Sequence, residues 1–301
     1  MIPPLPESQA VVWASPNQKA AQEAALVLRA MGLEHQLVGS PDGWSILVPA
    51  NAAPEAVAEL RGYQDENAFW PPKQIPFQQV SNGRLGGLIY GLLMITLFPI
   101  GQDGLAGRNW YEAGLVDGQR LREGEWERLV TALTLHADLP HLAGNLLFGI
   151  GFGILASHTL GSGLAWFLAL SAGALGNWIN VMVSDPGHRS LGASTAVFGL
   201  LGVMSSYEWV HRKHLPLVAL RRVAPLMGAA VLLGYLGMGS GDGTGRVDIG
   251  AHVFGFLGGI GLGALVGSAR VPQRLSTKGQ GLAGLLTLVL VTLAWALAHS
   301  R

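Results

Sequence analysis

The chain has 301 residues, a formal net charge of zero, only 13% charged residues and no cysteine. This charge balance gives no sign of a nucleic-acid partner, and the lack of cysteine excludes disulfides, thiolate catalysis and cysteine metal sites. A mean hydropathy of +0.37 with so few charges indicates a membrane protein that also carries a soluble part.

Residues 1–68 form the predicted soluble domain. Apolar periodicity and turn residues predict a strand, a helix, a two-stranded hairpin and a second helix, at 10–14, 17–31, 35–48 and 54–63. This βαββα order is typical of a small two-layer α/β module, too small for a deep catalytic cleft. We interpret it as a regulatory, interaction or structural module. Its first 20 residues lack the basic start and apolar centre of a cleavable signal peptide, so we expect the N-terminus in the cytosol.

A stiff, proline-rich linker follows at 69–84, with aromatic residues suited to a membrane interface. The remaining residues, 85–301, form the predicted transmembrane domain. Seven apolar runs in it are each near the length that crosses about 30 Å of hydrocarbon. They lie at 85–101, 139–159, 163–183, 191–209, 220–238, 248–268 and 281–299. A long charged loop, 102–138, separates the first two runs, and we expect it to pack on or in the interface.

Basic residues orient these spans. The connections that follow the fourth and sixth spans contain Arg212, Lys213, Arg221, Arg222, Arg270, Arg274 and Lys278. The short connections on the opposite side offer only Arg189 and Arg246. Because cytoplasmic loops carry the excess of lysine and arginine, we expect the basic connections and the N-terminal domain in the cytosol.

Polar side chains stand at the head of three spans that run in the same direction. His141 and Asn145 lie in the first two turns of the second span, Ser194 in the first turn of the fourth, and His252 in the first turn of the sixth. At 1.5 Å per residue, all four fall within about 10 Å in depth, just under the external face. Polar groups are costly there and indicate a functional site. Alternatively, the serine is inert because it bonds to a helical carbonyl, and His141 and Asn145 only link helices.

Ser194 and His252 form a candidate catalytic dyad, because a serine hydroxyl is a weak nucleophile until a nearby base takes its proton. Asp248 lies one turn before His252 but near the aqueous end, so we predict a dyad rather than a triad. His141 and Asn145, four residues apart on one helix face, can donate hydrogen bonds to an oxyanion.

Small residues allow the close helix approach that such a dyad needs. Gly255 and Gly259 form a small-xxx-small face on the sixth span, and Gly192 and Gly199 can serve likewise on the fourth.

Over residues 120–265, these motifs resemble the rhomboid family of intramembrane serine proteases. The residues that carry the resemblance are Gly124, Glu125, Trp126, Glu127, Arg128, His136, His141, Asn145, Gly192, Ala193, Ser194, Ala251, His252, Gly255 and Gly259. The resemblance implies a six-helix catalytic core with an added seventh helix. It also implies cleavage of transmembrane protein substrates near their external end by Ser194 and His252, with His141 and Asn145 in the oxyanion hole and no cofactor. A small cytosolic N-terminal domain is common among bacterial members, so we expect the protein in a bacterial inner membrane.

Two positions depart from the family pattern. Thr195 stands where the family usually has glycine, and a β-branched residue there narrows the space near the oxyanion amide. Glu127 separates the tryptophan and the arginine of the first-loop motif. We assign Arg128 a structural role, since it keeps the family's distance to His141. Phe198 stands where the family often places an aromatic side chain against the histidine ring.

Other interpretations remain open at the level of sequence. A rhomboid-like pseudoprotease, which holds transmembrane clients without cutting them, would be expected to lose the serine or the histidine. A transporter would place polar groups near the middle of the membrane on broken helices. A metal site made of His136, His141 and His252 lacks a carboxylate or a His-Glu spacing, so we predict no metal.

Overall fold

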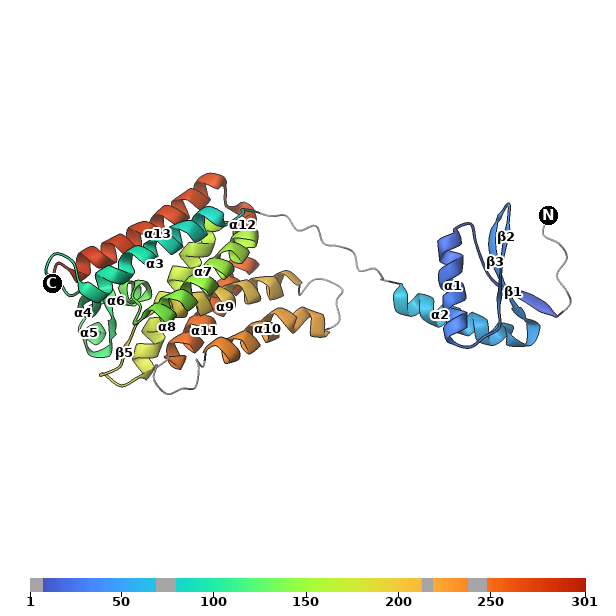
Figure 1. Cartoon of the computed structure of the whole chain (residues 1–301), viewed down its shortest axis with the longest axis horizontal. Coiled ribbons are helices and arrows are strands. Elements are labelled where there is room, and N and C mark those ends of the chain that lie inside the picture. Colours follow the sequence, from blue (N-terminus) through green and yellow to red (C-terminus); the bar gives the residue numbers. More distant parts are fainter. Residues whose placement is uncertain (1–7, 69–79, 213–218, 238–247) are drawn as a thin grey trace. The chain divides into compact units, whose positions relative to one another are not determined.

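A computed structural model describes residues 8–68, 80–212, 219–237 and 248–301 (Figure 1). The chain divides into two compact units, with the boundary between Phe77 and Gln78. Most of the proline-rich segment, 69–79, lies outside the described residues, and so do Lys213 and Arg246, which we used to orient the spans.

The N-terminal unit is a three-stranded antiparallel sheet covered by two helices. Its elements are β1 (Gln9–Ser15), α1 (Gln18–Ala30), β2 (Gln36–Ser40), β3 (Gly43–Pro49), the short 3-10 helix η1 (Ala50–Ala52) and α2 (Ala53–Asn67). The strand order is β1-β3-β2, so β3 pairs with both neighbours. Leu28, Ile46, Val48 and Leu60 form the core between the helices and the sheet. The main elements of this unit therefore follow one another in the order βαββα.

In its described residues, the second unit contains seven long helices, which are labelled in Figure 1. They are α3 (Arg84–Asp103), α7 (Leu139–Leu160), α8 (Ser162–Val183), α9 (Ser194–Arg212), α10 (Ala219–Gly237), α11 (Ile249–Ser268) and α13 (Thr277–Ala298). Each coincides with one of the predicted apolar runs. A four-residue helix, α12 (Val271–Arg274), connects the last two.

Among the described residues, five of these helices are long and apolar enough to cross a membrane: α3, α7, α8, α11 and α13. This is fewer than the seven spans predicted. The difference has a physical reason in α9, which carries Ser194, Ser205, Ser206 and Glu208 along its length. Because α9 packs against α7, α8, α10 and α11, it is enclosed by protein and needs little apolar surface toward lipid.

The long loop after α3 is folded rather than extended. It contains α4 (Trp110–Gly114), β4 (Val116–Asp117), α5 (Gly118–Arg122), α6 (Arg128–Thr131) and the 3-10 helix η2 (Ala132–Thr134). Strand β4 pairs with β5 (Arg189–Ser190) in the connection between α8 and α9. The loop therefore holds the segment that leads directly to Ser194.

Glycines let α9 and α11 approach closely. A Cβ on Gly255 would overlap the carbonyl of Thr195, and one on Gly259 would overlap the carbonyl of Gly199. Any larger residue would force the two helices apart. This contact is what brings the N-terminal ends of α9 and α11 together.

Candidate active site

The structure brings Ser194 and His252 into hydrogen-bond contact. Ser194 is the first residue of α9, and His252 lies in the first turn of α11. Ser194 Oγ is 2.8 Å from His252 Nε2. A nucleophile within this distance of a base has the geometry that proton transfer requires.

Phe198 holds the ring of His252 from the nucleophile's own helix. It lies one turn after Ser194, and its ring centroid is 4.7 Å from that of His252, with an angle of 40° between the planes. Both side chains are buried. A buried, tilted aromatic pair of this kind restricts rotation of the imidazole.

His141 and Gly192 border the space beside the Ser194 hydroxyl. A Cβ built on Gly192 would lie 2.7 Å from His141 Cε1 and Nε2, and 3.5 Å from Ser194 Oγ. Gly192 has φ +127°, a region that residues with a side chain rarely adopt. Its backbone N–H donates to the carbonyl of Ala132 in η2 at 2.9 Å. The His141 ring, the Gly192 backbone and the Ser194 hydroxyl therefore converge on one small volume.

The backbone at Ala137 indicates which ring nitrogen of His141 carries its proton. The amide of Ala137 approaches His141 Nδ1 at 3.5 Å, a long hydrogen bond in which the ring nitrogen is the acceptor. In a neutral ring, the proton then resides on Nε2, the atom beside Gly192. His141 can therefore offer an N–H donor beside the serine.

Asn145 lies one turn after His141 and is buried. Its side-chain amide donates to the backbone carbonyl of His141 in the same helix at 3.0 Å. The backbone carbonyl of Asn145 accepts from the Tyr90 hydroxyl of α3 at 3.0 Å. An asparagine amide has two N–H donors, and the bond to His141 takes one of them. The backbone of Asn145 thus links α7 to α3, whereas its side-chain amide is a potential second donor.

His136 lies behind His141, with the two ring centroids 5.2 Å apart in an edge-to-face arrangement. Burial, with the neighbouring His141 as a second cause, lowers the pKa of His136 to about 3. The His136 ring therefore stays neutral at physiological pH. Among the described residues, no group of three His, Asp or Glu side chains is arranged to hold a metal ion.

Arg128 has a structural position in the first loop. It is buried and donates to the side chain of Glu125 at 2.6 Å and to the carbonyls of Glu112 and Leu115 at 2.9 and 2.8 Å. These bonds fold the loop around one guanidinium. Trp126, in contrast, is more than half exposed.

Thr195 occupies a slot between two glycines. It is buried, and a Cβ on Gly176 of α8 or on Gly255 of α11 would lie 2.9 or 3.0 Å from its methyl carbon. The extra methyl group of Thr195, which the sequence analysis expected to narrow the space near the oxyanion amide, therefore lies where α8, α9 and α11 meet.

A polar network near the dyad was missed by the sequence analysis. Asp248 caps α11 through the amide of Ala251 at 3.0 Å. Its second carboxylate oxygen accepts from Asn180 at 2.8 Å and from the His188 ring at 2.9 Å. The signal that could have found the cap is an aspartate directly before an apolar helix.

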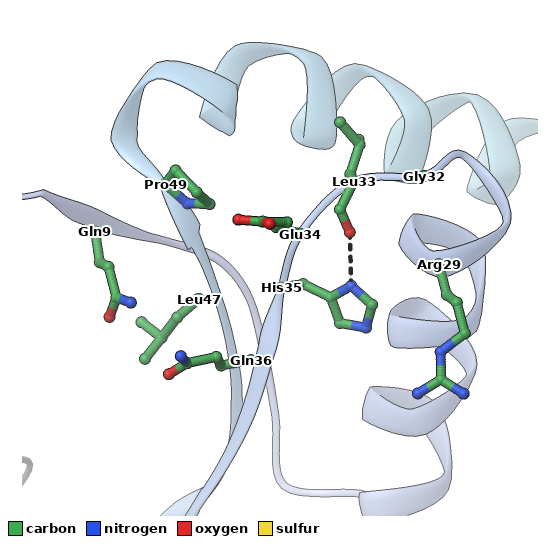
Figure 2. Close-up of a pocket in the computed structure, with 9 residues that line it drawn as sticks. All are labelled: Gln9, Arg29, Gly32, Leu33, Glu34, His35, Gln36, Leu47 and Pro49. Carbon is green, nitrogen blue, oxygen red and sulfur yellow. Dashed lines mark hydrogen bonds between the residues drawn. The ribbon is translucent and has the colours of Figure 1, made fainter.

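One pocket lies in the N-terminal unit, away from this chemistry in sequence (Figure 2). It is an open hollow of about 550 Å³, and Arg29, Glu34 and His35 are among the residues that line it. The His35 ring is fixed by a 2.9 Å hydrogen bond to the carbonyl of Leu33. Charges of both signs line the hollow, so it favours no single class of ligand.

Comparison with known proteins identifies a domain in the second unit. Residues 123–269 match the Rhomboid domain family model. The chain is 28% identical over 176 residues to the Rhomboid protease GluP of Bacillus subtilis (strain 168), covering 58% of this chain and 33% of that protein. It is 29% identical over 143 residues to the Putative rhomboid protease YdcA of the same organism, covering 46% of this chain and 65% of that one.

A plant relative gives a similar match. RHOMBOID-like protein 5 of Arabidopsis thaliana is 30% identical over 154 residues, which cover half of this chain and 47% of that protein. The chain thus spans between one third and two thirds of the length of these relatives. The matched domain contains the dyad, His141 and Asn145. Together with five apolar helices, these matches show that the chain is an integral, multi-pass membrane protein that contains a rhomboid domain.

Proposed function

We propose that the chain is an intramembrane serine endopeptidase that cleaves transmembrane protein substrates with a Ser194–His252 dyad. The observation that carries this proposal is the 2.8 Å separation of Ser194 Oγ and His252 Nε2 at the buried heads of two helices. The rhomboid protease relatives support the protease class. The retained serine and histidine argue against a client-binding module without activity.

In the first step, Ser194 Oγ attacks the scissile carbonyl carbon while His252 Nε2 accepts the hydroxyl proton. The carbonyl oxygen becomes an oxyanion. The Ser194 amide and the Nε2–H of His141 are the donors placed to receive it, and Asn145 can add a third. His252 then gives its proton to the leaving amine, which departs as the C–N bond breaks.

The resulting acyl-enzyme is hydrolysed by the reverse use of the same groups. His252 takes a proton from an attacking water, the oxyanion forms again at the same donors, and the ester bond to Ser194 Oγ breaks as the proton returns to it. No cofactor enters this sequence. The four side chains lie near the starts of helices that run in the same direction, so we expect the cut near the external membrane face. The basic connections favour a cytosolic N-terminal domain.

The test uses the full chain, purified in detergent, with a model transmembrane substrate. We expect a cleavage product from the wild type and from the control Ser206→Ala. The Ser206 hydroxyl bonds to carbonyls of its own helix. Ser194→Ala should give none while remaining folded. Substrate binding without any wild-type cleavage would favour the inactive, client-binding alternative instead.

A further inference from the structure

The last helix, α13, lies outside the matched domain of residues 123–269, yet it packs into the scaffold of the dyad. It contacts α8 and the loop helices α4 and α6, and the C-terminus lies beside these loop helices (Figure 1). Most of its large apolar side chains are exposed, whereas Val291 and Trp295 are buried. Those two residues therefore define the face that α13 turns toward the protein.

A chain of hydrogen bonds leads from Trp295 to the nucleophile loop. Trp295 Nε1 donates to Thr134 Oγ1 at 3.1 Å, and that hydroxyl donates to the Thr131 carbonyl at 2.7 Å. The intervening Ala132 carbonyl accepts the N–H of Gly192 at 2.9 Å. One turn, residues 131–134, therefore contacts Trp295 on one side and holds the backbone beside Ser194 on the other.

An apolar cluster repeats this connection independently. Val291 and Trp295 share a buried cluster with Leu133 and Leu135, and Leu191 and Ala196 pack against it. These last two residues flank Ser194 in the sequence. A Cβ on Gly173 would lie 2.8 Å from both Leu133 Cδ1 and Ala196 Cβ, so the cluster has little room to shift.

The site of Trp295 fits an indole closely. A Cβ on Gly114 would overlap the Trp295 ring. Trp110 lies with its ring centroid 4.7 Å away and His299 with its centroid 5.5 Å away. Two residues beyond His299, Arg301 pairs at 3.2 Å with the buried carboxylate of Glu127. The C-terminal end of α13 is therefore fixed to the first loop by shape, hydrogen bonding and charge.

We propose that α13 is part of the catalytic scaffold. Trp295 is a positioning residue for the turn 131–134 and, through this turn, for Gly192 and Ser194. The kinetic part of this inference rests on the proposed protease function. Trp295 is positioned to act on the nucleophile loop rather than on substrate, so its loss should lower kcat and leave KM unchanged.

The experiment compares Trp295→Phe, which keeps an aromatic ring but removes the N–H, with Thr134→Val, which removes the hydroxyl. We expect each to lower kcat roughly three- to tenfold, the range that the loss of one hydrogen bond supplies. Thr134→Ser, which keeps the hydroxyl, should retain wild-type kcat. The double variant Trp295→Phe/Thr134→Val should be little worse than either single variant, because both break the same bond.

Thr292→Val is the matched control. Thr292 is an exposed residue of α13 whose hydroxyl bonds to the carbonyl of Leu288 in the same helix at 2.9 Å. Its substitution removes one hydroxyl from α13 without touching the first loop, so kcat should not change. All rates are measured below the thermal transition of each variant.

Hydrogen exchange at the Gly192 amide gives a second measurement that needs no activity. In Trp295→Phe and Thr134→Val, we expect this amide to exchange faster than in the wild type and in Thr292→Val. If the wild type fails to cleave, the proposed function fails, and the exchange rate still decides this inference. Wild-type exchange at Gly192 in both variants, or wild-type kcat despite earlier melting, would overturn it.

Discussion

The ring of His188 donates a hydrogen bond to the carboxylate of Asp248 across 2.9 Å. His188 belongs to the connection that leads to Ser194, and Asp248 is the residue on which α11 begins, four positions before His252. The same carboxylate oxygen also accepts from Asn180 at the end of α8 at 2.8 Å. The two segments that supply the dyad are therefore joined at one aspartate.

This contact predicts a pH-dependent stability. The hydrogen bond to Asp248 raises the pKa of His188 above its usual value, although burial opposes it. The folded state thus binds the His188 proton more tightly than the unfolded state. The stability that this proton adds is therefore fully present below about pH 6.5 and is lost as pH rises through the raised pKa of His188. We expect the melting temperature of the wild type to fall more between about pH 6 and pH 8 than that of His188→Asn. Parallel melting curves for the two proteins across this window would refute the assignment.

A second prediction concerns Gly192. In Gly192→Ala, the new methyl group would lie 2.7 Å from the His141 ring, at a φ that alanine rarely adopts. The ring must move away from the serine, so we expect turnover to fall by at least about tenfold. Gly144→Ala on α7 is the matched control, because a Cβ there meets nothing within 4 Å. Equal turnover in the two variants would show that the His141–Gly192 contact has no catalytic role.

The third prediction separates the two roles of Asn145. If its amide stabilises the oxyanion, Asn145→Ala should lower kcat far more than it raises KM, since such a donor acts mainly in the transition state. Loss of one donor typically costs about 10²–10³ in turnover, and a smaller loss is expected here because His141 and the Ser194 amide remain. If the Asn145 side chain only stabilises α7 through its bond to the His141 carbonyl, the variant should melt earlier but turn over normally below its transition. The bond from Tyr90 goes to the Asn145 backbone, so the substitution keeps it. That second pattern would remove Asn145 from the catalytic set.

Local sequence patterns indicated the seven long helices and the elements of the N-terminal unit, but not the short helices of the loop after α3. Apolar runs of about 20 residues and glycine or proline at their ends are signals that neighbouring residues determine. For α9, hydropathy was a poorer predictor of a membrane span, because this helix is surrounded by other helices rather than by lipid. Ser205 and Ser206 bond to carbonyls of α9 itself, as with Ser205 and Leu201 at 2.7 Å.

The polar network and the contact of α13 could not be predicted in the same way. Trp295 and Thr134 are 161 positions apart, and His188 and Asp248 are 60 apart. Such pairs depend on how the helices pack, which no single segment specifies. Asp248 was set aside because it lies at the aqueous end of its helix, yet that position is what lets it cap α11 and reach His188.

The most direct test of the account is covalent labelling with a fluorophosphonate probe, located by mass spectrometry of the purified full chain. A serine reacts with such a probe when a neighbouring base activates its hydroxyl. We predict a phosphonyl adduct on Ser194 in the wild type and in Phe198→Leu, and almost none in His252→Ala, although all three proteins remain folded. An adduct on another serine with Ser194 unmodified, or equal labelling of Ser194 with and without His252, would contradict the dyad.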